Sequence, residues 1–70
     1  MSYQKTLRKH LFALRILKNL TKAEVAKAVG VDENTVSLWE RGTQEPTLQQ
    51  LSDLADILDV TVGFLLGQTN

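Results

Sequence analysis

The sequence predicts an all-α fold, with five short helices in a single domain that occupies residues 1–70. Apolar residues recur at intervals of three and four, as they do on the buried face of a helix. No segment alternates between apolar and polar residues as a strand does, and Thr or Asp precedes four of the five segments as an N-cap. Seventy residues leave room for one small domain, and an apolar fraction of 43% supplies its core.

The first predicted helix runs from about Gln4 to Lys18. Asn19 follows it, and asparagine is the residue that, after glycine, most readily takes the left-handed conformation at a helix C-terminus. Leucines spaced at i, i+4, i+7 and i+10 form the apolar stripe of this helix, which consists of Leu7, Leu11, Leu14 and Leu17.

The second predicted helix begins after Thr21 and reaches about Val29. Thr21 and Glu24 have the spacing of a capping box, in which the hydroxyl and the carboxylate each accept a backbone N–H. Gly30 follows, and glycine at this position ends a helix because it adopts positive φ without strain.

The third predicted helix covers about Glu33 to Arg41. Asp32 is its expected N-cap, and Gly42 is expected to end it. The side chains expected to face the core are Val36 and either Trp39 or Glu40.

The fourth and fifth helices follow a loop that contains the single proline, Pro46. Thr47 caps the fourth helix, about Leu48 to Leu58, and Thr61 caps a short fifth helix, Val62 to Leu66. The apolar stripe predicted for the fourth helix consists of Leu48, Leu51, Leu54, Ala55 and Leu58.

The composition argues against several classes of function. The chain has no cysteine and only one histidine, His10, so neither a metal site nor a cofactor is expected, and we expect no enzyme. No apolar run approaches the roughly 18 residues of a membrane span, and the N-terminus lacks the core of a signal peptide. These features predict a cytoplasmic protein with no membrane contact.

The net charge is zero, but its distribution is uneven. All eight basic residues lie in residues 1–41 with four acidic ones, whereas residues 42–70 hold four acidic residues and no basic ones. The two parts therefore carry +4 and −4 by count. This division suggests one face that meets an anion and one that does not, although chance in a short chain is an alternative explanation.

The most informative segment is the predicted helix-turn-helix over residues 21–41. Two short helices cross at a steep angle when the few residues that join them include a glycine. The second helix then projects from the surface. Such a helix fits the major groove of DNA, which is about 12 Å wide. Ala26 is small enough for the close approach of the two helices, and Gly30 supplies the turn.

The segment from Leu20 to Gly42 resembles the signature of the Cro/repressor helix-turn-helix family. Leu-Thr-x-x-x-Val-Ala is followed at the family's spacing by Trp-Glu-Arg-Gly. The resemblance continues through Pro46 and Leu51-x-x-Leu-Ala-x-x-Leu-x-Val to Phe64-Leu-Leu-Gly, and so spans about residues 7–67. It implies a five-helix lambda-repressor-like DNA-binding domain.

The resemblance also implies a function. It predicts a sequence-specific transcriptional regulator, of the phage or mobile-element repressor type, that inserts residues 33–41 into the major groove of a double-stranded DNA operator. It further implies a homodimer, with Leu58 and Phe64 near the contact, and an ion pair between Arg15 and Glu40 that ties the third helix to the first.

The predicted contact residues depart from the family pattern in two ways. Lys22 stands where the family has glutamine, and no residue on the outer face of the third helix is basic, whereas Asp32 and Glu33 are acidic. Asn34 suits adenine, and Glu33 can accept a bond from cytosine N4. The residues predicted to contact DNA or a partner are Lys18, Thr21, Lys22, Asp32, Glu33, Asn34, Thr35, Ser37, Leu38, Arg41, Thr43 and Gln44.

The acidic helix leaves a second hypothesis open. The same surface would suit an antirepressor or modulator that binds the DNA-reading helix of a partner repressor, because an acidic face mimics phosphate. Phe12 and Ile16 lie off the leucine stripe of the first helix and either widen the core or form a protein-contact patch. The residues of that predicted patch are Phe12, Ile16, Leu58 and Phe64.

Overall fold

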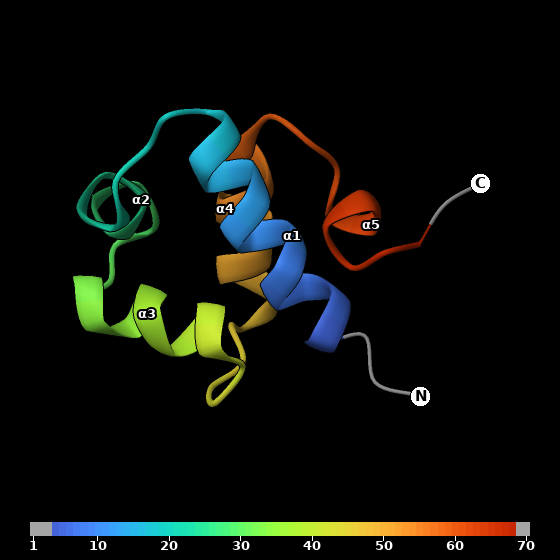
Figure 1. Cartoon of the computed structure of the whole chain (residues 1–70), viewed down its shortest axis with the longest axis horizontal. Coiled ribbons are helices and arrows are strands. Elements are labelled where there is room, and N and C mark those ends of the chain that lie inside the picture. Colours follow the sequence, from blue (N-terminus) through green and yellow to red (C-terminus); the bar gives the residue numbers. More distant parts are fainter. Residues whose placement is uncertain (1–3, 69–70) are drawn as a thin grey trace.

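The computed structural model describes residues 4–68, and this part of the chain is helical with no strand. Figure 1 shows α1, α4 and α5 on one side, with α2 and α3 on the other. No helix in residues 4–68 is long and apolar enough to cross a membrane. The predicted fold class is therefore confirmed, and helix ends differ from the predictions by one residue at most; the helices are α1 (Gln4–Leu17), α2 (Lys22–Val29), α3 (Glu33–Arg41), α4 (Leu48–Leu58) and α5 (Val62–Leu65).

Local hydrogen bonds fix the helix ends that the sequence predicted. Thr21 forms a full capping box with Glu24, and each of the other predicted N-caps accepts the backbone N–H three residues later. Asn19 has φ 58°, as expected of a left-handed C-cap. Asp59 takes the same conformation after α4, which the sequence pattern did not predict.

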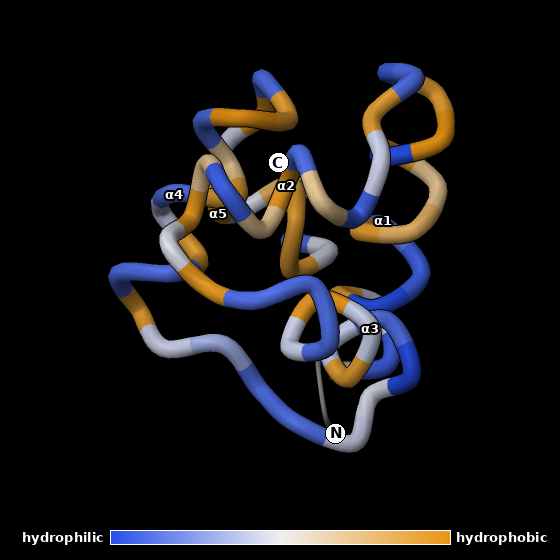
Figure 2. Tube along the Cα trace, turned by 90° about the vertical axis from the view of Figure 1, so that its left-hand side faces the viewer, coloured by the Kyte–Doolittle hydropathy of each residue, from blue (hydrophilic) through white to orange (hydrophobic). Residues whose placement is uncertain are grey.

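The core is built around two wholly buried valines, Val25 of α2 and Val36 of α3, and the ring of Trp39, also from α3. Figure 2 shows apolar and polar stretches alternating along the chain, as expected when each helix buries one face. Among the described residues, the remaining buried members of this core are Leu7, Leu11, Ala26, Leu51, Leu54, Leu58 and Leu65.

Three expectations about leucines were wrong. Leu17 is 77% exposed and Leu48 is 85% exposed, although both were assigned to apolar stripes. Leu17 lies about 80° around the helix from Leu7, at 100° per residue, and is the last residue of α1. Leu48 is the first residue of α4, and helical side chains point toward the N-terminus, so this one projects past the end of the helix. Leu58 has no exposed surface and cannot belong to a contact patch.

The other three residues of the predicted patch lie at the surface. Phe12 is 52%, Ile16 54% and Phe64 43% exposed, so none of them widens the core. Phe64 stacks on His10 with ring centroids 5.1 Å apart. His10 Nδ1 also donates to the Phe64 carbonyl at 2.9 Å, and these contacts dock α5 on α1.

We expect Leu54→Ala to lower the free energy of unfolding by about 3 kcal/mol, because it leaves a cavity in the core. Leu48→Ala makes the same chemical change in the same helix at an exposed site, and we expect a change within about 0.5 kcal/mol. Urea denaturation followed by circular dichroism measures both. Equal losses for the two variants would contradict this account of the core.

Candidate nucleic-acid interface

The turn between α2 and α3 depends on Gly30. Its φ of 84° lies in the left-handed region, and its N–H donates to the carbonyl of Ala26 at 2.8 Å. A Cβ built on Gly30 would meet nothing within 4 Å, so the backbone conformation and not the available space favours glycine here. Ala26 is itself buried, which allows the two helices to pack closely. The turn thus directs α3 away from α2 along the surface.

The N-terminus of α3 is fixed by Asp32. Its Oδ1 accepts both the backbone N–H and the hydroxyl of Thr35, each at 2.8 Å. The hydroxyl bond and then the backbone bond hold the pKa of Asp32 below its ordinary value of 3.8. The carboxylate is therefore ionised at neutral pH. Because the Thr35 hydroxyl donates to Asp32, it is not free to donate to a ligand.

The outer face of α3 is set by two buried residues on its inner face. Val36 is wholly buried and Trp39 is 2% exposed, so the side of the helix opposite these two residues is turned outward. Of the predicted contact residues, those at the surface are Lys18, Thr21, Asp32, Glu33, Asn34, Arg41, Thr43 and Gln44. Those that are partly buried are Lys22, Thr35, Ser37 and Leu38.

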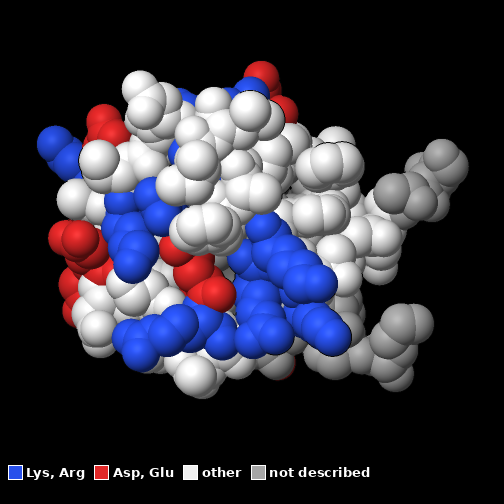
Figure 3. All heavy atoms as spheres, in the orientation of Figure 1, with Lys and Arg blue, Asp and Glu red and all other residues white. Residues whose placement is uncertain are grey.

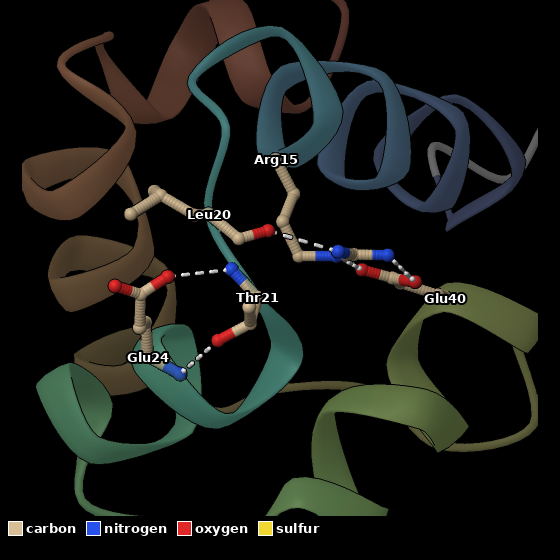
Figure 4. A network of polar contacts seen from close by, with 5 residues as sticks. All are labelled: Arg15, Leu20, Thr21, Glu24 and Glu40. Atoms are coloured by element: carbon tan, nitrogen blue, oxygen red, sulfur yellow. Dashed lines mark hydrogen bonds and ion pairs between the residues drawn. The ribbon is translucent and has the colours of Figure 1, made fainter.

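The ion pair implied by the resemblance is present (Figure 4). Arg15 Nε donates to Glu40 Oε2 at 2.6 Å, and Nη2 donates to Oε1 at 3.3 Å. The two side chains are only 9% and 7% exposed. Two parallel bonds of this kind fix orientation as well as distance, so the last turn of α3 is held against α1.

The same guanidinium reaches a third segment. Arg15 Nη1 donates to the carbonyl of Leu20 at 3.0 Å. Leu20 immediately precedes Thr21, whose hydroxyl and N–H form the capping box with Glu24 (Figure 4). Arg15 therefore links α1, the start of α2 and the end of α3.

Arg8 is a residue of this region that sequence reasoning missed. Its Nη1 donates to the carbonyl of Arg41 at 3.0 Å, at the C-terminus of α3. Arg8 lies seven residues before Arg15, which is two helical turns, so both side chains lie on the same face of α1. Because Arg15 was expected to contact α3, the spacing of two turns could have predicted that Arg8 does so as well.

Basic residues gather over α1 and α3 on the face of the molecule that Figure 3 shows. Figure 3 shows Lys and Arg over the N-terminal part of α1 and around α3, with Asp and Glu among them. Lys5, Lys9 and Arg41 are exposed members of these two helices. An anionic ligand that meets α3 therefore also meets cations from α1.

The described residues include a small pocket but no cluster of side chains suited to a metal ion. No group of three or more His, Cys, Asp or Glu side chains in residues 4–68 is placed to hold a metal ion. A shallow pocket of about 270 Å³ lies between α2 and α4, lined by Ala28, Asp53, Asp56 and Ile57. The projecting face of α3 is thus the more distinctive feature.

Comparison with protein families and curated proteins gives consistent matches. The model of a family described as Helix-turn-helix matches residues 11–65. The chain is 36% identical over 56 residues to the cryptic phage CTXphi transcriptional repressor RstR of Vibrio cholerae, covering 80% of this chain and 50% of that protein. It is 36% identical over 58 residues to the HTH-type transcriptional regulator AnsR of Bacillus subtilis, covering 83% and 50%. The chain spans about half the length of these relatives.

Two solved structures share the arrangement of the helices. The clp gene regulator ClgR from Corynebacterium glutamicum superposes with a TM-score of 0.87 at 26% identity, over 97% of this chain and 72% of that one. The P22 c2 repressor protein, solved in complex with a synthetic operator, superposes with a TM-score of 0.84 at 28% identity, over 90% and 96%.

We expect Glu40→Gln to lower the free energy of unfolding by about 3 kcal/mol, because it leaves the buried Arg15 charge without its partner. Glu45→Gln, which makes the same change on the exposed loop, should have an effect within about 0.5 kcal/mol. The double variant Arg15→Met/Glu40→Leu should recover most of the loss, since it removes both charges. Urea denaturation tests all three, and a double variant no more stable than Glu40→Gln would refute this account of the pair.

We expect Thr35→Val to raise the pKa of Asp32 toward 3.8, because it removes the larger cause of the shift, whereas Thr35→Ser keeps the hydroxyl and the low pKa. A carboxyl with a lower pKa in the folded than in the unfolded chain stabilises the fold above pH 3.8, and this contribution is lost as pH falls through the folded pKa. Thr35→Val should therefore lose less stability than wild type between pH 5 and pH 2. Carbon-13 NMR titration of Asp32 measures the shift, and an unchanged pKa in Thr35→Val would rule out the hydroxyl as its cause.

Proposed function

The chain belongs to the Cro/repressor-type helix-turn-helix family, and we propose that it is a transcriptional regulator that reads double-stranded DNA with α3 in the major groove. The observation that carries this proposal is the outward face of α3, which is held rigidly and lined with polar groups. The likeness to RstR favours a repressor of the phage type.

The base-reading set is small in this proposal. Asn34 binds adenine through its amide, Ser37 binds a base edge or phosphate through its hydroxyl, and Leu38 contacts a thymine methyl. Glu33 accepts a bond from cytosine N4. The Thr35 hydroxyl donates its hydrogen to Asp32, so Thr35 offers DNA only its methyl group and the acceptor lone pairs of its oxygen.

Contacts with the phosphate backbone come from residues around α3. Lys18 lies shortly before α2 and Lys22 is its first residue, whereas Arg41 ends α3 and is followed closely by Thr43 and Gln44. Lys22 meets phosphate as a point charge, where the family pattern has glutamine. Each phosphate that a cation neutralises steepens the salt dependence of binding by about 0.9 in the log–log slope.

The proposal includes a homodimer on a palindromic operator. Dimers of helix-turn-helix proteins place two recognition helices about 34 Å apart, one turn of DNA, so each chain reads one half-site. Phe64 is the member of the predicted dimer contact that remains at the surface, since Leu58 is buried.

One observation favours a second candidate function. The first turn of α3 carries two exposed carboxylates, Asp32 and Glu33, and ionised acidic groups suit the basic DNA-reading surface of a partner repressor better than they suit phosphate. In this alternative the chain is an antirepressor that uses the same face of α3.

Selection from a pool of randomised 24-base-pair duplexes separates the two candidates. We expect the 70-residue chain to enrich a palindromic sequence and to bind it with an affinity that falls steeply between 50 and 200 mM salt. No enrichment at micromolar protein would overturn the DNA-binding proposal and favour the antirepressor.

Glu33→Gln should raise the affinity for the selected duplex by about threefold at 100 mM salt, because it removes a negative charge next to the phosphates. Asp56→Asn makes the same change in net charge on α4, outside the helix-turn-helix, and should leave the affinity nearly unchanged. Fluorescence anisotropy on a labelled duplex measures both. An equal gain for the two variants would mean that net charge, not the docking of α3, sets the affinity.

A further inference from the structure

We propose that Arg8 is a positioning residue for α3, holding the C-terminal end of the helix in the orientation that sequence discrimination requires. The consequence for DNA rests on the function proposed above, whereas the structural role of Arg8 does not. Arg8 lies outside the signature segment Leu20–Gly42 and is not among the predicted contact residues.

The contact of Arg8 with α3 has two parts. The guanidinium Nη1 donates to the carbonyl of Arg41 at 3.0 Å. The side chain also packs on the open face of Gly42, where an added Cβ would lie 2.8 Å from Arg8 Cδ and 3.0 Å from Nη1. Arg8 therefore occupies the space that a side chain at residue 42 would need.

The Arg8 contact provides a hydrogen-bond donor for a backbone carbonyl at the C-terminus of α3. The last carbonyls of a helix have no partner within the helix, and a cation near them interacts favourably with the helix dipole. Gly42 has φ 77° and its N–H reaches back to the carbonyls of Leu38 and Trp39. Arg8 supplies a partner for Arg41, the residue before this turn. The chain then leaves α3 for Thr43 and Gln44.

Arg8 and Arg15 together form a two-point attachment of α3 to α1. Arg15 holds Glu40 through the side-chain pair, and Arg8 holds the adjacent residue through the backbone. The N-terminal half of α1 lies beside the end of α3 in Figure 1. The second contact adds to the ion pair and to the buried side chains of Val36 and Trp39 in holding the C-terminal end of α3 against α1. Loss of Arg8 should thus misalign Asn34 and Ser37 with the bases while leaving phosphate attraction largely intact.

The first experiment compares Arg8→Met with Lys9→Met, each of which removes one cation from the same part of α1. Binding is measured by anisotropy on the selected duplex and on a scrambled duplex of the same composition. Arg8→Met should reduce the preference for the selected duplex by about tenfold, the discrimination of one good base contact. Lys9→Met should weaken binding to both duplexes equally. An equal weakening for Arg8→Met would assign Arg8 to the phosphate charge alone and overturn the positioning role in DNA reading.

The second experiment needs no DNA. Gly30→Ala and Gly42→Ala impose the same backbone strain, at φ 84° and φ 77°, but only the second displaces a side chain. Gly42→Ala should therefore reduce the folding equilibrium constant about fivefold more than Gly30→Ala, the value of one hydrogen bond. In an Arg8→Ala background, the two glycine substitutions should cost the same.

The two experiments separate failure of this inference from failure of the proposed function. If wild type selects no DNA sequence, the proposed function fails and the glycine cycle alone decides the structural role of Arg8. If the difference between the two glycine variants persists without Arg8, then Arg8 does not hold the end of α3 and the inference fails, whatever the chain binds.

Discussion

The ion pair between Arg15 and Glu40 is the constraint on which the rest of this structure depends. A buried pair adds little net stability, because the two charges lose their hydration when the chain folds. Its importance is geometric: one guanidinium binds Glu40 at the end of α3 and the Leu20 carbonyl before α2. Since these are the two helices of the helix-turn-helix, one side chain with directed bonds joins both of them to α1.

The fold was predictable because local signals and the apolar pattern agree. Thr21 and Asp32 fix helix starts, and Asn19 and Gly30 fix helix ends, each by a bond within a few residues in sequence. The errors concern tertiary contacts. Burial of Leu48 was inferred from periodicity, which does not show where neighbouring helices stop. The Arg15 pair came from the family resemblance, whereas the contact of Arg8 with the Arg41 carbonyl lies outside the signature segment, and only the seven-residue spacing from Arg15 pointed to it.

At Trp39 the core buries a large aromatic ring even though the indole N–H is left without a hydrogen-bond partner among the described residues. Trp39 is 2% exposed, yet among the described residues its Nε1 has no hydrogen-bond partner. An unpaired buried N–H costs about 1–3 kcal/mol, whereas an indole buries more apolar surface than any other side chain. The ring fills the space between α3 and its neighbours, and the apolar surface that it buries outweighs the cost of the unpaired N–H. On the inner face of α3, the choice of residue therefore depends on how well its side chain fills the core.

The outer face of α3 does not have to fill space in the core. Its N-terminus is capped by Asp32, its inner side is anchored by Val36 and Trp39, and its C-terminus is held by α1. None of these contacts uses the side chains of Asn34 or Ser37, so substitutions there should change the chemistry of the outer face at little cost to the fold. The same independence explains how an acidic first turn is compatible with a DNA-reading scaffold. Asp32 is required by the cap, Glu33 is favoured by the helix dipole, and exposed cations lie on α1 and at the far end of α3.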